Sequence, residues 1–138
     1  MADILKLSIP GKPEYVGTVR LAVSHVAASA GFDVEAIDDI KVAVSEACTN
    51  SICHSNHTSE YTYDVIIERE ENRLTISVED KGVGFKTESY VAPVPGETRG
   101  SGMGIFIVRA LMDEVEIKSE VGIGTNIRMT KYLQSRSA

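Results

Sequence analysis

The stretch YTYDVIIEREENRLTISVED, residues 61–80, contains the clearest periodic pattern in the sequence. Apolar and polar side chains alternate over residues 61–69 and again over residues 73–79, and such alternation is typical of strands with one buried face. The polar tripeptide at positions 70–72 separates the two runs and predicts the turn of a β-hairpin. The hairpin predicts an antiparallel part of a sheet, around which the remaining segments must be placed.

One strand and two helices are predicted on the N-terminal side of the hairpin, beginning with a strand over residues 3–9. Apolar residues then recur at helical spacing over residues 14–30, and Gly31 stands in the position of a C-terminal cap. Asp33 is a suitable N-cap for a second helix, which the pattern extends over about residues 34–55.

A loop, a helix and two strands are predicted on the C-terminal side. Residues 80–101 contain glycine and proline but no periodicity, and a loop of this length is usually a lid or a binding loop. A third helix is predicted over about residues 102–112. Two strands follow over about residues 114–120 and 125–132, with a glycine turn between them.

The order of the predicted elements indicates the fold class. Hairpin strands grouped apart from the helices are typical of an α+β fold, here a two-layer α/β sandwich whose mixed, mostly antiparallel sheet has helices on one face. A doubly wound fold is excluded because regular alternation of strands and helices is missing. The length of 138 residues fits one domain over residues 1–138.

The composition restricts partners and compartment. A net charge of −6 argues against a direct nucleic-acid partner, because such proteins gather Lys and Arg against phosphates. No apolar stretch approaches the roughly 20 residues that cross a bilayer, and the first residues lack the features of a signal peptide. We therefore expect a cytoplasmic protein without a membrane partner. Cys48 and Cys53 do not face each other on the predicted helix, and we expect both to be reduced.

A carboxylate and a carboxamide are stacked on the second predicted helix. Glu46 and Asn50 are i and i+4, so they lie one turn apart on the same side, away from the apolar stripe. An amide oxygen is a suitable ligand for Mg²⁺, and a carboxylate can accept a proton from an attacking hydroxyl. A solvated polar face is the alternative interpretation. His54 continues the row and is predicted to cap the helix end.

The motif DKGVGF at residues 80–85 directly follows a predicted strand. Gly82 and Gly84 let the backbone approach a flat ligand closely. The carboxylate of Asp80 can accept a hydrogen bond from an exocyclic amine, such as that of adenine. An ordinary turn explains the same residues, so this motif is weak by itself.

A glycine-rich segment runs into the third predicted helix, and its residues are Gly100, Ser101, Gly102, Met103 and Gly104. Free backbone N–H groups at the start of a helix form a site for anions. Arg99, at the edge of this segment, could neutralise phosphoryl charge. An ordinary solvated arginine explains this residue equally well. Thr125 follows a glycine turn and could add a hydroxyl contact, although a hairpin turn is a sufficient explanation.

The order and spacing of these motifs resemble the GHKL superfamily of ATPases, which have the Bergerat fold. The N, G1, G2 and G3 boxes of that superfamily correspond to the Glu-x-x-x-Asn pair, the Asp-x-Gly-x-Gly motif, the glycine-rich segment and Gly-Thr. The chain is also similar, over essentially its whole length, to anti-sigma-factor serine-protein kinases of the RsbW and SpoIIAB type. The stretches that carry this similarity are Pro13–Gly17, Val44–Asn50, Gly102–Gly104, Leu111–Val115 and Met129–Leu133.

The resemblance implies that these motifs bind ATP and Mg²⁺. Asn50 would coordinate the Mg²⁺ that bridges the phosphates, and Asp80 would recognise the adenine amine. Glu46 would be the general base for a serine hydroxyl, with Arg99 facing the γ-phosphate. The candidate nucleotide-binding residues are therefore Asn50, His54, Asp80, Gly82, Gly84, Gly100, Ser101, Gly102, Met103, Gly104 and Thr125.

The resemblance also implies protein partners. Members of the family phosphorylate a serine on an anti-anti-sigma protein of the STAS type, and their dimer sequesters a sigma factor. Arg20 matches a position on the partner-binding surface, with an ordinary exposed arginine as the alternative. A homodimer that regulates transcription, for example in a stress response or in sporulation, is the expected role.

Two alternative functions share the same pocket. A non-catalytic switch would bind ATP only to set its affinity for a sigma factor, and the absence of phosphate transfer would distinguish it. The catalytic domain of a sensor histidine kinase is disfavoured, because that chemistry needs a helix pair with a phosphoacceptor histidine, for which 138 residues leave no room.

Overall fold

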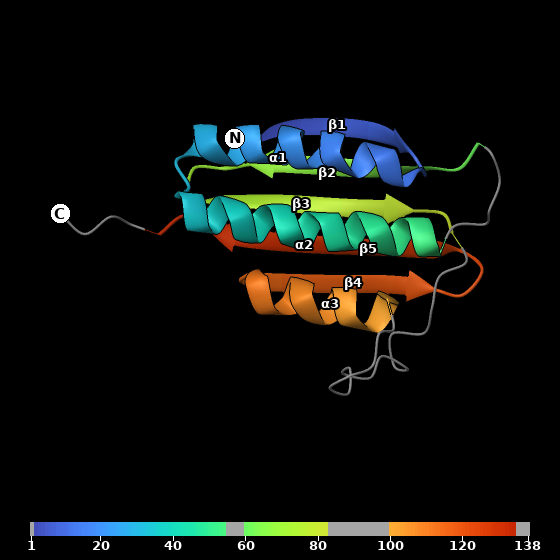
Figure 1. Cartoon of the computed structure of the whole chain (residues 1–138). Helices are drawn as coiled ribbons and strands as arrows, with labels where there is room; N and C mark the ends of the chain where they lie inside the picture. Colours follow the sequence, from blue (N-terminus) through green and yellow to red (C-terminus); the bar gives the residue numbers. More distant parts are fainter. Residues whose placement is uncertain (1, 55–59, 83–99, 135–138) are drawn as a thin grey trace.

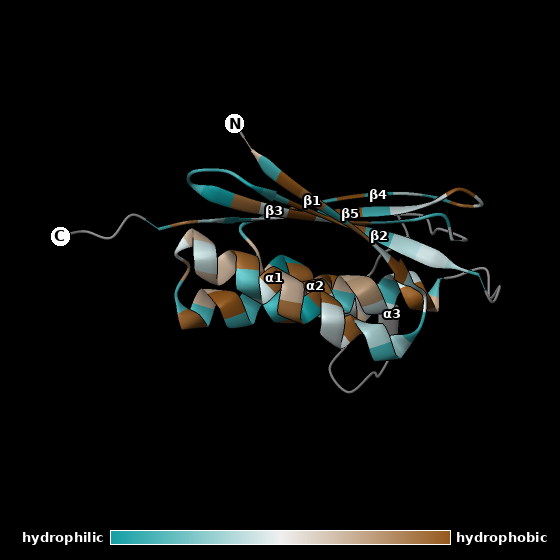
Figure 2. Ribbon diagram, turned by 90° about the horizontal axis from the view of Figure 1, so that it is seen from above, coloured by the Kyte–Doolittle hydropathy of each residue, from teal (hydrophilic) through white to brown (hydrophobic). Residues whose placement is uncertain are grey.

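The predicted hairpin lies in the middle of a five-stranded sheet in the computed structural model of the protein, which describes residues 2–54, 60–82 and 100–134. The strands are β1 (Asp3–Pro10), β2 (Thr62–Arg69), β3 (Arg73–Asp80), β4 (Glu114–Glu120) and β5 (Gly124–Tyr132). Their order across the sheet is β1-β2-β3-β5-β4. One face of this sheet is covered by the helices α1 (Val16–Ala30), α2 (Val34–Cys53) and α3 (Gly100–Leu111), as Figures 1 and 2 show.

The strand register places the alternating apolar residues on the face that the helices cover. Val65 of β2 lies opposite Val78 of β3, and Val78 lies opposite Ile127 of β5. All three side chains are buried. Because neighbouring residues of a strand point to opposite faces, the same register directs the intervening polar residues away from the helices.

Local signals end α1 and begin α2, as predicted. Gly31 follows α1 with a φ of 100°, a left-handed conformation that glycine adopts at low cost. The side chain of Asp33 accepts a hydrogen bond from the backbone N–H of Ala36 at 2.8 Å and so caps α2. This short connection lets the two helices lie side by side on the sheet (Figure 1).

The core lies between the helix layer and the sheet. Its fully buried apolar side chains include Val19, Val23, Ile40, Val44, Val65, Ile67, Leu74, Ile76, Val78 and Met129. Burial of each such Val, Leu or Ile side chain contributes about 1.5–3 kcal/mol to stability. This packing holds the ends of α2 and β3 in defined positions relative to each other.

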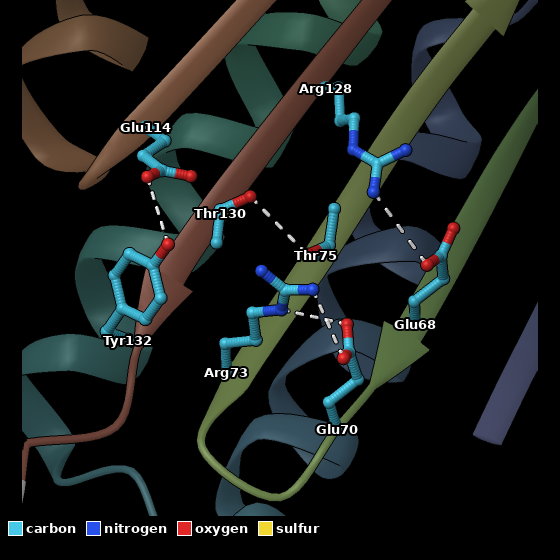
Figure 3. A network of polar contacts seen from close by, with 8 residues as sticks. All are labelled: Glu68, Glu70, Arg73, Thr75, Glu114, Arg128, Thr130 and Tyr132. Carbon is cyan, nitrogen blue, oxygen red and sulfur yellow. Dashed lines mark hydrogen bonds and ion pairs between the residues drawn. The ribbon is translucent and has the colours of Figure 1, made fainter. Parts of the chain in front are cut away.

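The face of the sheet that the helices leave uncovered carries a polar network (Figure 3). Arg73 donates from Nε to Oε1 of Glu70 at 2.9 Å, and this hydrogen bond lowers the pKa of the Glu70 carboxyl. Arg128 of β5 approaches Glu68 of β2 at 3.9 Å across β3. Exposed ion pairs of this kind contribute little to stability, so the helix-covered face contributes most of it.

The predicted α+β sandwich is confirmed, with differences in detail. All the strand pairings in the described ranges are antiparallel, so the sheet is not mixed. A 3-10 turn over Pro13–Tyr15 precedes α1, which therefore begins at Val16 and not near residue 14. The third helix begins at Gly100 and not near residue 102, so the glycine-rich segment is itself helical. No helix within the described part is both long and apolar enough to cross a bilayer.

Candidate functional site

Four elements meet at one end of the two layers. α2 and β3 end there, while α3 and β5 begin there (Figure 1). Glu46 and Asn50 lie in the second half of α2, Asp80 is the last residue of β3, Gly104 lies near the start of α3, and Thr125 near the start of β5. The topology therefore brings together candidate residues from all four predicted motifs.

Asn50 is buried, with only 4% of its surface exposed. Neither its Nδ2 nor its Oδ1 has a hydrogen-bond partner among the residues that the structure describes. An unpaired buried amide costs about 1–3 kcal/mol, so native proteins keep one only where it has a use. The alternative interpretation of a solvated polar face is therefore wrong for Asn50, because both of its amide atoms are buried.

Glu46 lies one turn before Asn50 and is half-buried. Its carboxylate faces the start of α3, where a Cβ atom added to Gly104 would lie 3.0 Å from Oε2 of Glu46. Glycine at position 104 therefore lets the α3 backbone pack directly against this carboxylate. Gly104 is the fifth residue of α3, so the N–H groups that have no partner within the helix belong to the turn directly before this contact.

Both carboxylate oxygens of Asp80 are hydrogen-bonded within the protein. Gly82 donates its backbone N–H to Oδ1 at 2.8 Å, and Ser51 donates its hydroxyl to Oδ2 at 2.8 Å. Asp80 itself is only 9% exposed. A side chain at position 82 would overlap the carbonyl oxygen of His54, so glycine is required where the chain after β3 passes the end of α2.

Tyr61 connects the start of β2 to the same cluster. Its hydroxyl donates to the backbone oxygen of Ser51 at 3.0 Å, which satisfies a carbonyl in the last turn of α2. Burial, and then the negative charge of Asp80, raise the pKa of the Tyr61 hydroxyl. Tyr61 therefore remains protonated and able to donate across the physiological pH range.

The start of β5 lies against Asp80. Thr125 is opposite Asp80 in the β3–β5 register and is buried, and its hydroxyl lies 2.8 Å from Oγ of Ser119. Gly124 has a φ of 144°, and a side chain there would overlap the backbone oxygen of Asp80. A cavity at this edge of the sheet is lined by residues of the strand ends and turns, Tyr61, Asp80, Gly124 and Thr125 among them, and not by residues of the described helices.

Four further residues, outside the glycine-rich segment, were predicted to belong to the site: His54, Arg20, Gly84 and Arg99. His54 is the C-cap of α2, as predicted, and its Nδ1 lies 2.9 Å from the backbone oxygen of Asn50. Arg20 is exposed on α1. Gly84 and Arg99 lie outside the described residues, so their predicted roles stay predictions.

The glycine-rich segment forms the first turns of α3. Gly100, Ser101 and Gly102 are helical, Met103 is half-buried and Gly104 is buried. The N-terminal end of a helix favours anions through its free N–H groups and its dipole. The predicted anion site is therefore the helix terminus itself rather than a loop that precedes it.

Sequence reasoning missed Ser51 and Tyr61. Ser51 falls in the apolar stripe of α2, where a small polar residue is easily taken as core packing. The available signal was a hydroxyl on a core-facing position directly after Asn50. Tyr61 gave no signal, because an aromatic residue at the start of a strand is ordinary.

Comparison with known proteins agrees with this arrangement. The family described as histidine kinase-like ATPase domain matches residues 9–131, which is most of the chain. The chain therefore belongs to the histidine kinase-like ATPase domain family.

Two curated relatives narrow this class. Serine-protein kinase RsbW of Bacillus pumilus is 38% identical, and the alignment covers 95% of this chain and 86% of that protein. Serine-protein kinase RsbW of Listeria monocytogenes serovar 1/2a is 38% identical over 99% of this chain and 91% of its own length. Within its family, the chain is thus a member of the RsbW group.

Solved structures show the same fold. The RsbU and RsbW domains of a Mycobacterium tuberculosis protein match with a TM-score of 0.70 and 21% identity, covering 98% of this chain. The match covers 34% of that solved chain, so this chain spans about a third of it. A histidine kinase domain from Erythrobacter litoralis matches with a TM-score of 0.59 and 23% identity, covering 91% of this chain and 62% of that one.

Proposed function

We propose that this chain is a single-domain serine-protein kinase that uses ATP and Mg²⁺ and also acts as an anti-sigma factor. The observation that carries the proposal is the buried Asn50 carboxamide, which has no partner among the described residues and lies one turn from the Glu46 carboxylate. The relatives named serine-protein kinase support this class of reaction.

The residues at this end of the sandwich fit a magnesium–nucleotide complex. The unpaired amide oxygen of Asn50 is the kind of hard donor that Mg²⁺ prefers. The start of α3 suits the phosphates, because its free N–H groups and helix dipole favour negative charge. The carboxylate of Asp80 keeps acceptor capacity for the adenine amine, since each oxygen can accept more than one hydrogen bond.

Glu46 is the proposed general base. The serine hydroxyl of the substrate gives its proton to the Glu46 carboxylate while its oxygen bonds to the γ-phosphorus. The bond between that phosphorus and the ADP oxygen breaks, and phosphoserine and ADP are the products. Arg99 is proposed to face the charge that develops on the phosphoryl group. Mg²⁺, when bound, offsets part of the negative charge of the triphosphate.

The proposed partners are a STAS-type anti-anti-sigma protein as substrate and a sigma factor as the sequestered protein. Arg20 is exposed on α1, as a partner-binding residue must be. A homodimer acting in the cytoplasm is proposed on the same family resemblance.

The test is a phosphotransfer assay. The protein is incubated with MgATP and the STAS protein of the same organism, and phosphoserine is measured. Glu46→Gln should abolish transfer and retain ATP binding, because the amide keeps the shape of the side chain but cannot accept the proton. Ser45→Ala is the control on the same helix, since the Ser45 hydroxyl donates only to the helix carbonyl of Lys41.

Three outcomes decide between the candidate functions. Transfer by the wild type but not by Glu46→Gln supports the kinase and its base. Equal transfer by both proteins would overturn the assignment of Glu46. ATP binding and sigma-factor capture without any transfer would instead support the non-catalytic switch.

A further inference from the structure

Ser51 is the polar member of the apolar stripe that α2 presents to the core. It is 1% exposed, among side chains such as Val44, Ala47 and Cys48. Its hydroxyl does not bond back to its own helix, as that of Ser45 does, and donates instead to Oδ2 of Asp80. The hydroxyl therefore links the helix layer to the end of β3 across 29 positions of sequence.

The two donors on Asp80 act on different oxygens. The Gly82 N–H holds Oδ1 and the Ser51 hydroxyl holds Oδ2, each at 2.8 Å. With both bonds made, the carboxylate group cannot turn about its bond to Cβ without losing one of them. The lone pairs that remain on each oxygen then point in defined directions.

The backbone of Ser51 is in turn held by a hydrogen bond from Tyr61. The Tyr61 hydroxyl donates to the backbone oxygen of Ser51, and the backbone oxygen of Tyr61 accepts the N–H of Gly11 at 2.8 Å. A side chain at Gly11 would overlap the Tyr61 ring, so the turn after β1 packs directly on that ring. The position of Ser51, whose hydroxyl donates to Asp80, is thus fixed by three segments: α2 itself, the residue before β2 and the turn after β1.

We propose that Ser51 is a positioning residue for base recognition, aiming the Asp80 carboxylate so that the site prefers purine nucleotides that carry an amino group at position 6. This inference rests on the proposed function, in which Asp80 accepts from that amine. Without the hydroxyl, Asp80 would keep one of its two internal bonds and lose its fixed orientation. Affinity for the amino group would fall, while contacts to the phosphates and the ribose would remain.

The test compares two nucleotides that differ only in the amino group, ATP and purine riboside triphosphate, both with Mg²⁺ and both titrated by calorimetry. Ser51→Ala should weaken ATP binding about tenfold, in the range of a hydrogen bond to a charged group, and change binding of the purine analogue less than about twofold. Ser51→Thr keeps the hydroxyl and should retain the preference for ATP. Ser45→Ala should leave both affinities at the wild-type values.

Each result is decisive. A tenfold fall in the ratio of the two affinities, confined to Ser51→Ala, supports the positioning role. An equal loss of affinity for both nucleotides would show that Ser51 acts only on the general structure. An unchanged ratio of the two affinities, with neither affinity reduced, would show that Asp80 is oriented without Ser51. Either result overturns the inference and leaves the kinase proposal standing. Failure of the wild type to bind ATP would overturn both proposals.

Discussion

Asp80 and Asn50 are buried polar side chains at the same end of the molecule, and they differ in their hydrogen bonding within the described structure. Asp80 has hydrogen bonds to both carboxylate oxygens, from Ser51 and Gly82. Asn50, which directly precedes Ser51, has none on either amide atom within the described structure. The two side chains are 9% and 4% exposed, so different access to water does not explain the contrast.

The contrast separates two ways of building a binding site. At Asp80 the protein supplies the partners in advance, so the carboxylate is oriented before a ligand arrives. At Asn50 the part of the protein that the structure describes leaves buried hydrogen-bonding capacity unused, at a cost in folding free energy that a ligand would recover. We infer that Asp80 provides selectivity and Asn50 provides affinity.

The largest expected effect comes from removing each side chain in turn. Asn50→Ala should weaken MgATP binding about 100-fold, yet raise the free energy of unfolding of the nucleotide-free protein by about 1 kcal/mol, because an unpaired buried amide is lost and alanine favours the helix. Asp80→Ala should also weaken ATP binding but lower stability by about 2 kcal/mol, because Ser51 and Gly82 lose their acceptor. Calorimetry and urea unfolding measure the two quantities.

Opposite signs of the two stability changes would support the comparison. A clear loss of stability in Asn50→Ala would mean that the Asn50 amide is already hydrogen-bonded within the protein. The contrast between an oriented Asp80 and an unpaired Asn50 would then be wrong.

An intermediate effect is expected at the contact between α3 and Glu46. Gly104→Ala places a carbon 3.0 Å from Oε2 of Glu46, so the carboxylate must move by a few tenths of an ångström. We expect phosphotransfer to slow about tenfold, because catalysis is sensitive to such displacements, while ATP affinity changes less than about threefold. Gly17→Ala is the matched control, since a carbon added at Gly17 meets no atom within 4 Å. Equal slowing in both variants would contradict a specific role for Gly104.

The smallest effect concerns Tyr61, which donates a hydrogen bond to the backbone of Ser51, the residue whose hydroxyl donates to Asp80. Because burial and Asp80 raise its pKa, Tyr61 stabilises the fold fully below the ordinary tyrosine pKa of about 10, and this contribution is lost as pH rises toward the folded-state pKa. When pH rises from about 8 to about 10.5, the free energy of unfolding should therefore fall less in Tyr61→Phe than in the wild type. The difference between the two falls should reach up to about 1 kcal/mol, measured by urea unfolding. The exposed Tyr15 supplies the control Tyr15→Phe, which should follow the wild type. Parallel pH curves for all three proteins would contradict the prediction.

Much of the fold could be predicted because its signals are local. The alternation around residues 61–79 predicted the hairpin, and Gly31 and Asp33 marked the helix limits that the structure confirms. The start of α3 could not be predicted, because three glycines within five residues disfavour a helix, and most of the stability of a helix in a protein comes from tertiary packing.

The candidate site divides in the same way. The sequence by itself determined that Glu46 and Asn50 share one side of a helix, since this follows from 3.6 residues per turn. Only the tertiary structure decided that Asn50 is buried, with its amide unpaired among the described residues, and that Ser51 holds Asp80. Burial and hydrogen bonding between distant residues depend on how α2 lies on the sheet, and that placement results from the whole core rather than from any one segment.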